Sequence, residues 1–286
     1  MYTSGNSPLR IQSIMPLPKV KLPTESSQQS STQQDLDRPT AIQIYEHVTR
    51  NGRRELARSN TTLAISGIVG GLTMGLTGLS ISAVTAQLGY SASAQFIAFL
   101  LYPMGFMAVI LGRGQLFTEN TLYPVALILD ERRYVVSTLR LWGIVFVTNV
   151  AGALLFALLC ARTSALRPDI LDALIRYGAE AAAPSAVHIF WSAVVGGWII
   201  AMVAWLVSGS HSISGSVAII WVLTFIVGLG HFAHCIASSG EILSAVVSGH
   251  VATLAYLKWL ALATSGNITG GVVLVTLLQY GQSKLE

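Results

Sequence analysis

Apolar residues fall into six long runs along this chain of 286 residues. A membrane-spanning helix needs about 20 consecutive apolar residues, and each run is close to that length or longer. The pattern therefore predicts an all-α integral membrane protein with six spanning segments, near 62–88, 93–129, 136–161, 184–208, 213–249 and 264–281.

The second and fifth runs are too long for one straight crossing, and polar residues interrupt both. The interruptions read GRGQLFTENT at 112–121 and GLGHFAHCIASSGE at 228–241. Backbone that leaves the helix at membrane depth persists only where protein or water covers it, so both predict broken helices beside a permeation pathway. Because the broken segment is the second of each three-helix half, we expect an inverted repeat.

An internal sequence match supports the repeat. The run NVAGALL begins at Asn149 in the third segment, and NITGGVV begins at Asn267 in the sixth. Both follow the pattern N-x-x-G-small-apolar-apolar, which predicts structural roles for Asn149, Asn267, Gly270 and Gly271.

The residues before the first span divide into two parts. Residues 1–39 are rich in Ser, Thr, Gln and Pro, so we expect a disordered cytoplasmic tail, retained because it carries no apolar signal segment. Over 40–60, apolar residues recur among arginines at helical spacing, which predicts an amphipathic cytoplasmic helix along the membrane surface. A plain helical lead-in to the first span fits equally well. We place the six-helix channel domain at 61–282.

Composition and charge agree with a membrane location. Hydrophobic residues make up 52% of the chain, charged residues only 10%, and the mean hydropathy is +0.61, which excludes most soluble enzyme folds. With both termini in the cytoplasm, 12 basic residues lie on the cytoplasmic face and four on the other, as the positive-inside rule requires. The net charge of +4 therefore reflects topology in the cell (inner or plasma) membrane, and no nucleic-acid partner is expected.

Metal, disulfide and cofactor chemistry find no support in the sequence. Cys160 and Cys235 lie in apolar surroundings without zinc-ligand spacing, so we interpret them as small buried hydrophobic residues. No nucleophile elbow, cofactor fingerprint or nucleotide-binding motif is present, and an enzyme is the weakest interpretation. We expect no cofactor.

Ionisable residues within the two interruptions are the candidates for function. Arg113 and Glu119 lie in the first, and Glu241 is the last residue of the second. Because charges in the membrane are costly, we expect the three to pair, either as a charge network bordering a pore or as a buried pair that locks the two loops together.

Two histidines also lie in the second interruption. We expect His234 to face the pore, because it sits among polar neighbours in a helix break and histidine titrates near physiological pH. His231 is equally compatible with a structural role. His188, His211 and His250 fit helix-end or interfacial positions.

Three motifs together resemble the formate/nitrite transporter family: LFTENT at 116–121, GHFAHCIAS at 230–238 and GNITGG at 266–271. The resemblance spans roughly residues 60–281. The longer strings GRGQLFTENTL and GWIIAMVAWL resemble a less characterised branch of the family.

The resemblance implies an aquaporin-like six-helix protomer that assembles as a homopentamer, each protomer with its own pore. It further implies that His234 faces the pore, bonded by Thr118 of the L-F-T loop. The pore-lining apolar slits would hold Tyr102, Phe106, Leu116, Phe117 and Ile200.

The sequence departs from the formate channels at two positions of the proposed pore. Gly197 stands before Trp198 where those channels usually have an asparagine that faces the histidine, and His231 stands where a small residue is common. Arg113, Glu119 and Glu241 add charges that the formate channels do not generally carry there.

These features predict a proton-coupled channel or transporter for small monovalent weak-acid anions of the formate/nitrite type. Its partners would be such an anion or its conjugate acid, protons and the lipid bilayer. Two alternatives stay open: a channel for a small neutral solute, favoured by Gly197 and the added carboxylates, and a non-conducting membrane scaffold that recruits partners through its tail.

Overall fold

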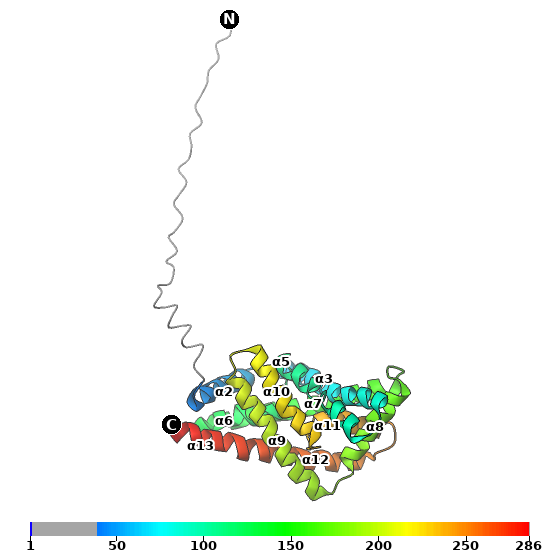
Figure 1. Ribbon diagram of the computed structural model, residues 1–286. Coiled ribbons are helices and arrows are strands. Elements are labelled where there is room, and N and C mark those ends of the chain that lie inside the picture. The colour runs from blue at the N-terminus through cyan, green and yellow to red at the C-terminus, as the bar shows by residue number, and fades with distance from the viewer. Residues whose placement is uncertain (2–38, 286) are drawn as a thin grey trace. The chain divides into compact units, whose positions relative to one another are not determined.

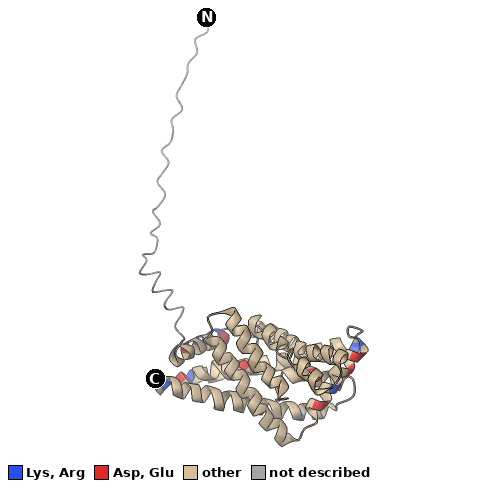
Figure 2. Cartoon of the chain, in the orientation of Figure 1, with Lys and Arg blue, Asp and Glu red and all other residues tan. Residues whose placement is uncertain are grey.

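The computed structural model describes Met1 and residues 39–285, so the tail expected over 1–39 lies almost wholly outside the described residues. The described chain is a helical bundle in which long apolar helices run side by side (Figure 1). Figure 2 shows that most of its charged residues gather toward the two ends of this bundle, with few charged residues between them. This distribution is the one that a lipid bilayer requires.

The first half of the chain places helices on both sides of one break. Its elements are α2 (Ala41–Leu56), α3 (Asn60–Leu88), α4 (Ala92–Phe99), α5 (Met104–Leu111), η1 (Glu119–Thr121), α6 (Tyr123–Asp130), η2 (Arg132–Tyr134) and α7 (Val135–Arg162). The break lies between α5 and η1, inside the second apolar run.

The second half repeats this order. Its elements are α8 (Pro168–Ala182), α9 (Ala186–Ser208), α10 (Ile213–Leu229), α11 (Ala237–Val247), α12 (Thr253–Thr269), the π-helical η3 (Gly270–Leu277) and α13 (Leu278–Leu285). The break lies between α10 and α11, inside the fifth run. The prediction of an all-α membrane protein with broken second and fifth segments is therefore confirmed.

Local sequence sets where these helices begin. Serine hydroxyls accept a hydrogen bond from the backbone N–H three residues on at the starts of α3, α9 and α10. Thr40 and Gln43 form a reciprocal capping box before α2. Each cap satisfies an amide that the first helical turn leaves without a partner.

Two shorter amphipathic helices cover opposite ends of the bundle. α2 rests on α6 through Gly52, where an added Cβ would lie 2.5 Å from the Tyr123 carbonyl oxygen. α8 rests on α11 through Gly178, where an added Cβ would lie 2.2 Å from the Glu241 carbonyl oxygen. Since Tyr123 and Glu241 hold equivalent positions in the two halves, the inverted repeat includes these surface helices.

The sequence analysis missed part of this arrangement. It assigned no element to α8, whose apolar residues cover only one face of a 15-residue helix. It also began the sixth segment at residue 264, whereas α12 starts at Thr253. Lys258 shortens the apolar run there without ending the helix, because a long basic side chain near a helix end can reach the membrane surface.

Candidate functional site

The two breaks have the same backbone geometry. Arg113 and His231, 118 positions apart in the chain, are the two non-glycine residues with positive φ among the described residues, at 59° and 50°. In each break the next residue donates its N–H to a carbonyl five residues back: Gly114 to Val109 at 2.9 Å and Phe232 to Val227 at 3.0 Å. One turn geometry therefore ends both α5 and α10.

An asparagine from each half holds each break in place. Asn149 of α7 accepts a hydrogen bond from the Phe117 N–H at 2.9 Å and donates to the carbonyls of Gly67 and Gln115, both at 2.8 Å. These bonds satisfy backbone groups that lipid could not.

Asn267 of α12 repeats this pattern in the second half. It accepts from the Cys235 N–H at 2.8 Å and donates to the carbonyls of Ala193 and Ala233 at 2.7 and 2.9 Å. The glycines that follow permit close packing, since an added Cβ would lie 2.0 Å from the Val194 carbonyl oxygen at Gly270 and 2.1 Å from the Thr121 hydroxyl at Gly271. Asn149 and Asn267 thus tie the spans of the two halves to the breaks.

A polar contact joins the two breaks at the centre of the bundle. The Thr118 Oγ1 lies 2.8 Å from the His234 Nε2, and both residues are buried. The Ala237 N–H donates to the His234 Nδ1 at 2.9 Å. Because Nδ1 is an acceptor, the proton of the neutral ring is on Nε2, which donates to the threonine hydroxyl. The hydroxyl hydrogen of Thr118 is then free to be donated to another group.

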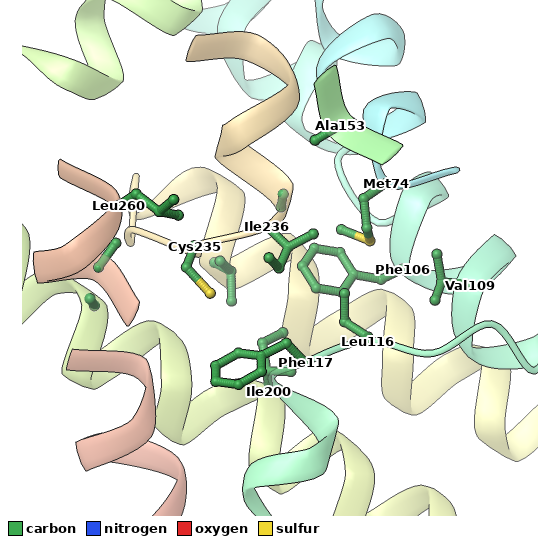
Figure 3. Close-up of a cluster of buried hydrophobic side chains, with 14 of the residues drawn as sticks. Met74, Phe106, Val109, Leu116, Phe117, Ala153, Ile200, Cys235, Ile236 and Leu260 are labelled. Carbon is green, nitrogen blue, oxygen red and sulfur yellow. The ribbon is translucent and has the colours of Figure 1, made fainter. Parts of the chain in front are cut away.

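Apolar side chains surround this pair. Phe106 packs edge to face on the His234 ring, with centroids 5.1 Å apart, and Tyr102 lies 5.9 Å from Phe106. Leu116, Ile200 and Ile236 are fully buried in the same cluster, and the close-up in Figure 3 shows their side chains gathered around Phe106 and Phe117.

Phe117 also reaches across to α7. Its ring centroid lies 5.7 Å from that of Trp142 and 5.1 Å from that of Phe146. It therefore contacts both the central cluster, which also holds Tyr102, Phe106, Leu116 and Ile200, and a neighbouring span.

One cavity, which we call the α2-side cavity, opens beneath α2. It measures about 680 Å³. Four arginines line it, namely Arg50, Arg54, Arg58 and Arg113, and so do Glu55 and Glu119. A hydrogen-bonded chain runs along its wall, because Gln115 donates to Glu55 at 2.7 Å and Asn120 donates to Gln115 at 3.0 Å. The excess of positive charge makes this cavity attractive to anions.

A second cavity, which we call the α8-side cavity, lies at the opposite end beneath α8. It measures about 300 Å³, and its lining includes Tyr102, His231, Ser238, Glu241 and Trp259. No lysine or arginine lines it. The two cavities therefore differ in charge, although the backbone around them is repeated.

The expected pairing of Arg113, Glu119 and Glu241 is not what the structure shows. Arg113 and Glu119 line the α2-side cavity, but Glu241 lines the α8-side cavity, and no ion pair joins any two of them within residues 39–285. Arg113 is exposed to its cavity and needs no partner there. The broken helices separate the charges because each break returns the chain to its own side of the bundle.

The glycine before Trp198 faces a helix rather than the histidine. An added Cβ at Gly197 would lie 2.2 Å from the Asn267 carbonyl oxygen on α12. Gly71 faces the Asn149 carbonyl in the same way, with an added Cβ at 1.9 Å. Position 197 is thus a contact between spans, which the sequence analysis did not anticipate.

Sequence reasoning also missed functional candidates outside the two interruptions at 112–121 and 228–241. Trp259 of α12 lines the α8-side cavity, and its indole N–H is buried without a hydrogen-bond partner. Trp259 belongs to none of the motifs, so the sequence did not indicate a role for it. Glu55 on α2 belongs to the hydrogen-bonded wall of the other cavity; only its place on an amphipathic helix pointed to it.

Comparisons with known proteins agree with this architecture. The profile of the formate/nitrite transporter family matches residues 42–281. The inner membrane protein YfdC of Escherichia coli (strain K12) is 29% identical over 245 residues, which cover 85% of this chain and 78% of YfdC.

Two solved structures share the fold. A protein described as an FNT family ion channel superimposes with a TM-score of 0.75 at 15% identity, covering 84% of this chain and 98% of that one. A pentameric formate channel with formate bound superimposes with a TM-score of 0.66 at 16% identity, covering 79% and 98%. This fold is the aquaporin-like one expected from the sequence.

Proposed function

Because the chain belongs to the formate/nitrite transporter family, whose members are transporters and not enzymes, we propose that it conducts small monovalent weak-acid anions of the formate type, coupled to protons. The observation that carries the proposal is the Thr118–His234 contact between the two breaks, walled by apolar side chains, with a cavity on either side.

The apolar wall determines the form in which the solute crosses. Transfer of a bare anion past Phe106, Leu116 and Ile200 costs far more than transfer of a neutral polar molecule. Protonation removes most of that barrier. The anion therefore gathers in a cavity, acquires a proton near His234 or through water next to it, and crosses as the neutral acid.

Thr118 and His234 guide the solute through this passage. The imidazole donates to the Thr118 hydroxyl, which leaves the hydroxyl hydrogen for a solute oxygen. A hydrogen bond made at the narrowest apolar point offsets part of the dehydration of the acid. Thr118 thus orients the ring and provides the one polar contact, and flux follows the proton gradient.

The same proposal includes orientation and assembly. Basic residues are concentrated on the α2 side, which supports a cytoplasmic location of both termini by the positive-inside rule, in the inner or plasma membrane. Large apolar side chains such as Trp191, Val187 and Val136 are exposed on the single chain. Lipid and neighbouring subunits of a homopentamer would cover them, since the related formate channel is described as pentameric.

A second candidate is a channel for a small neutral solute. It is favoured by the buried carboxyl groups of Glu119 and Glu241, one in each cavity, which would repel anions when ionised. A non-conducting scaffold would pass neither kind of solute.

Purified protein in proteoliposomes tests these possibilities. Internal pH is followed while formate, nitrite, acetate, lactate or hydrosulfide is added outside, at external pH 5 to 8. We expect at least one to acidify the lumen faster than in empty vesicles, increasingly so as the external pH falls, because more of the acid is protonated. Equal rates with and without protein for every anion would exclude the proposal, and glycerol or water flux would then separate the neutral channel from the scaffold.

A further inference from the structure

We propose that Glu241 is the proton donor of the α8-side cavity: it protonates the weak-acid anion there before the acid enters the apolar passage. This inference rests on the proposed function and moves the protonation step from the surroundings of His234 to the α8-side cavity, where it names the residue that supplies the proton.

The Glu241 carboxyl group is buried but borders a cavity. Glu241 is 6% exposed and lines the α8-side cavity. Its Oε1 has no hydrogen-bond partner among the described residues. The side chain lies against α3, where an added Cβ at Gly78 would come within 2.4 Å of its Cγ. No ion pair involves it within residues 39–285. An ionised carboxylate here would lack a counter-charge, so the buried position favours the neutral acid, which is a proton donor.

The surroundings of Glu241 provide no competing cation. The other titratable groups that line the cavity are Tyr102, Tyr177, Glu180, His188 and His231. Glu180 is exposed and paired with Arg176 at 2.8 Å, and Tyr177 is bonded to Thr85 at 2.8 Å. The His231 ring packs on Phe99, with centroids 4.9 Å apart. Glu241 is the buried carboxyl group among them.

A second unpartnered group in the cavity fits a carboxylate. The indole N–H of Trp259 is buried and has no acceptor. One oxygen of a small monocarboxylate can accept from this N–H, while its other oxygen accepts from the Glu241 acid. An apolar solute would leave both groups unsatisfied, which is unfavourable. The pair thus points to a monocarboxylate as the ligand of this cavity.

His234 does not supply this proton in the observed geometry. Its Nδ1 accepts from the Ala237 N–H, and its Nε2 donates to Thr118. Charging the ring would place a second proton on Nδ1 and break the bond to Ala237. Giving up the Nε2 proton would leave an imidazolate. Glu241 is under neither constraint.

The proton transfer balances without any further reactant. The O–H bond of the Glu241 acid breaks, and an O–H bond forms on the bound carboxylate, so that Glu241 becomes the anion and the solute becomes the neutral acid. The transfer moves one negative charge from the bound carboxylate to Glu241, so the cavity holds one anion and one neutral acid both before and after the step. Water in the cavity then returns a proton to Glu241 from the same side of the membrane.

The test compares four proteins in proteoliposomes: the wild type, Glu241→Gln, Glu241→Met and the control Glu180→Gln. Formate is added outside, and the initial rate of internal acidification is measured from pH 5 to pH 7. Without Glu241, only acid formed in bulk solution can enter, and the rate falls tenfold for each pH unit. With Glu241, formate that enters the cavity as the anion is also protonated there, so the rate falls less steeply with pH. We expect the wild type to exceed Glu241→Gln at least tenfold at pH 7 and less than twofold at pH 5.

The controls separate this role from others. Glu180→Gln removes a paired carboxylate from the same cavity and should keep the wild-type pH profile. Glu241→Met serves if the glutamine variant does not assemble, since an apolar side chain of similar size suits a buried site. A wild-type pH profile in an assembled Glu241 variant would overturn the inference but leave the proposed function intact. Absence of formate flux in the wild type would instead contradict the proposed function.

Discussion

Arg113 and His231 occupy equivalent points of the two chain breaks, and both have left-handed backbone conformations, with φ of 59° and 50°. Their side chains line opposite cavities, Arg113 on the α2 side and His231 on the α8 side. A non-glycine residue in this region is strained by about 1 to 2 kcal/mol. The same strained turn therefore occurs in both halves of the repeat, with a guanidinium group in the first half and an imidazole group in the second.

This strain predicts the order of stability of two variants at residue 231. His231→Gly removes the Cβ and His231→Ala retains it, so the glycine variant should be more stable by about 1 kcal/mol. Thermal unfolding of the detergent-solubilised protein measures the difference. At His188, within α9, the order should reverse because glycine disfavours a helix. An alanine variant as stable as glycine at residue 231 would contradict the assignment of strain.

The central histidine predicts a loss of transport without a loss of assembly. His234→Phe preserves much of the ring volume but removes the bonds to Thr118 and Ala237. We expect an assembled pentamer with no formate-dependent proton flux, measured by size-exclusion chromatography and by proteoliposome acidification.

The matching change at the neighbouring histidine identifies which ring acts. His231→Phe should retain flux, because His231 lies at the rim of the α8-side cavity and not between the breaks. Normal flux in His234→Phe together with lost flux in His231→Phe would move the functional role to His231.

The two asparagines predict matched losses of stability. Asn149→Ala and Asn267→Ala each remove three hydrogen bonds to backbone groups. At about 1 kcal/mol for each bond, either variant should lose roughly 3 kcal/mol. Asn60→Ala, which removes one exposed bond of 3.3 Å, should change the unfolding free energy by well under 1 kcal/mol. A loss confined to one of the two buried asparagines would show that the halves are not held alike.

The separation of the buried charges predicts additive effects. Arg113 and Glu241 line different cavities, so a double-mutant cycle of Arg113→Ala with Glu241→Gln should show a coupling below about 0.5 kcal/mol. Arg113→Ala alone should have a small effect because the side chain is exposed. Arg140→Ala is the control; it removes bonds to the Leu56 and Arg58 carbonyls and should cost more. A coupling energy of about 3 kcal/mol or above would instead support the buried pair that the sequence analysis expected.

The contact between α2 and the loop after α6 predicts a pH dependence. The hydrogen bond from Arg53 holds the pKa of the Glu131 carboxyl below its usual value near 4.5. A lowered pKa means that the contact stabilises the fold at neutral pH and that this contribution is lost as the pH falls through the folded-state pKa. The melting temperature of the wild type should exceed that of Glu131→Gln at pH 7, and the gap should close toward pH 3. Glu46→Gln, on the exposed face of α2, should show no such convergence.

The sequence predicted the breaks well because the physical rule behind them is strict. Glycine and polar strings inside apolar runs cannot remain in lipid unless covered, so residues 112–121 and 228–241 marked the breaks on composition alone. The match between Asn149 and Asn267 was also visible, because its spacing is preserved in both halves.

The partners of the charged residues could not be predicted in the same way. Arg113 and Glu241 both lie near helix breaks in sequence, but the side of the bundle that each faces depends on how its chain segment returns. α8 was missed for a different reason. Its 15 residues form an amphipathic helix with one buried face, and a search for long apolar runs does not detect such a helix.

Gly52 and Gly178 give each side of the membrane a separate point of control. A single methyl group at either position would push one surface helix away from the carbonyl on which it rests. The other helix lies at the far end of the bundle and would stay in place. Alanine at residue 52 would therefore widen only the entrance on the α2 side, and alanine at residue 178 only the entrance on the α8 side. Access to the central passage could then be altered from one side of the membrane at a time, without any change to the passage itself.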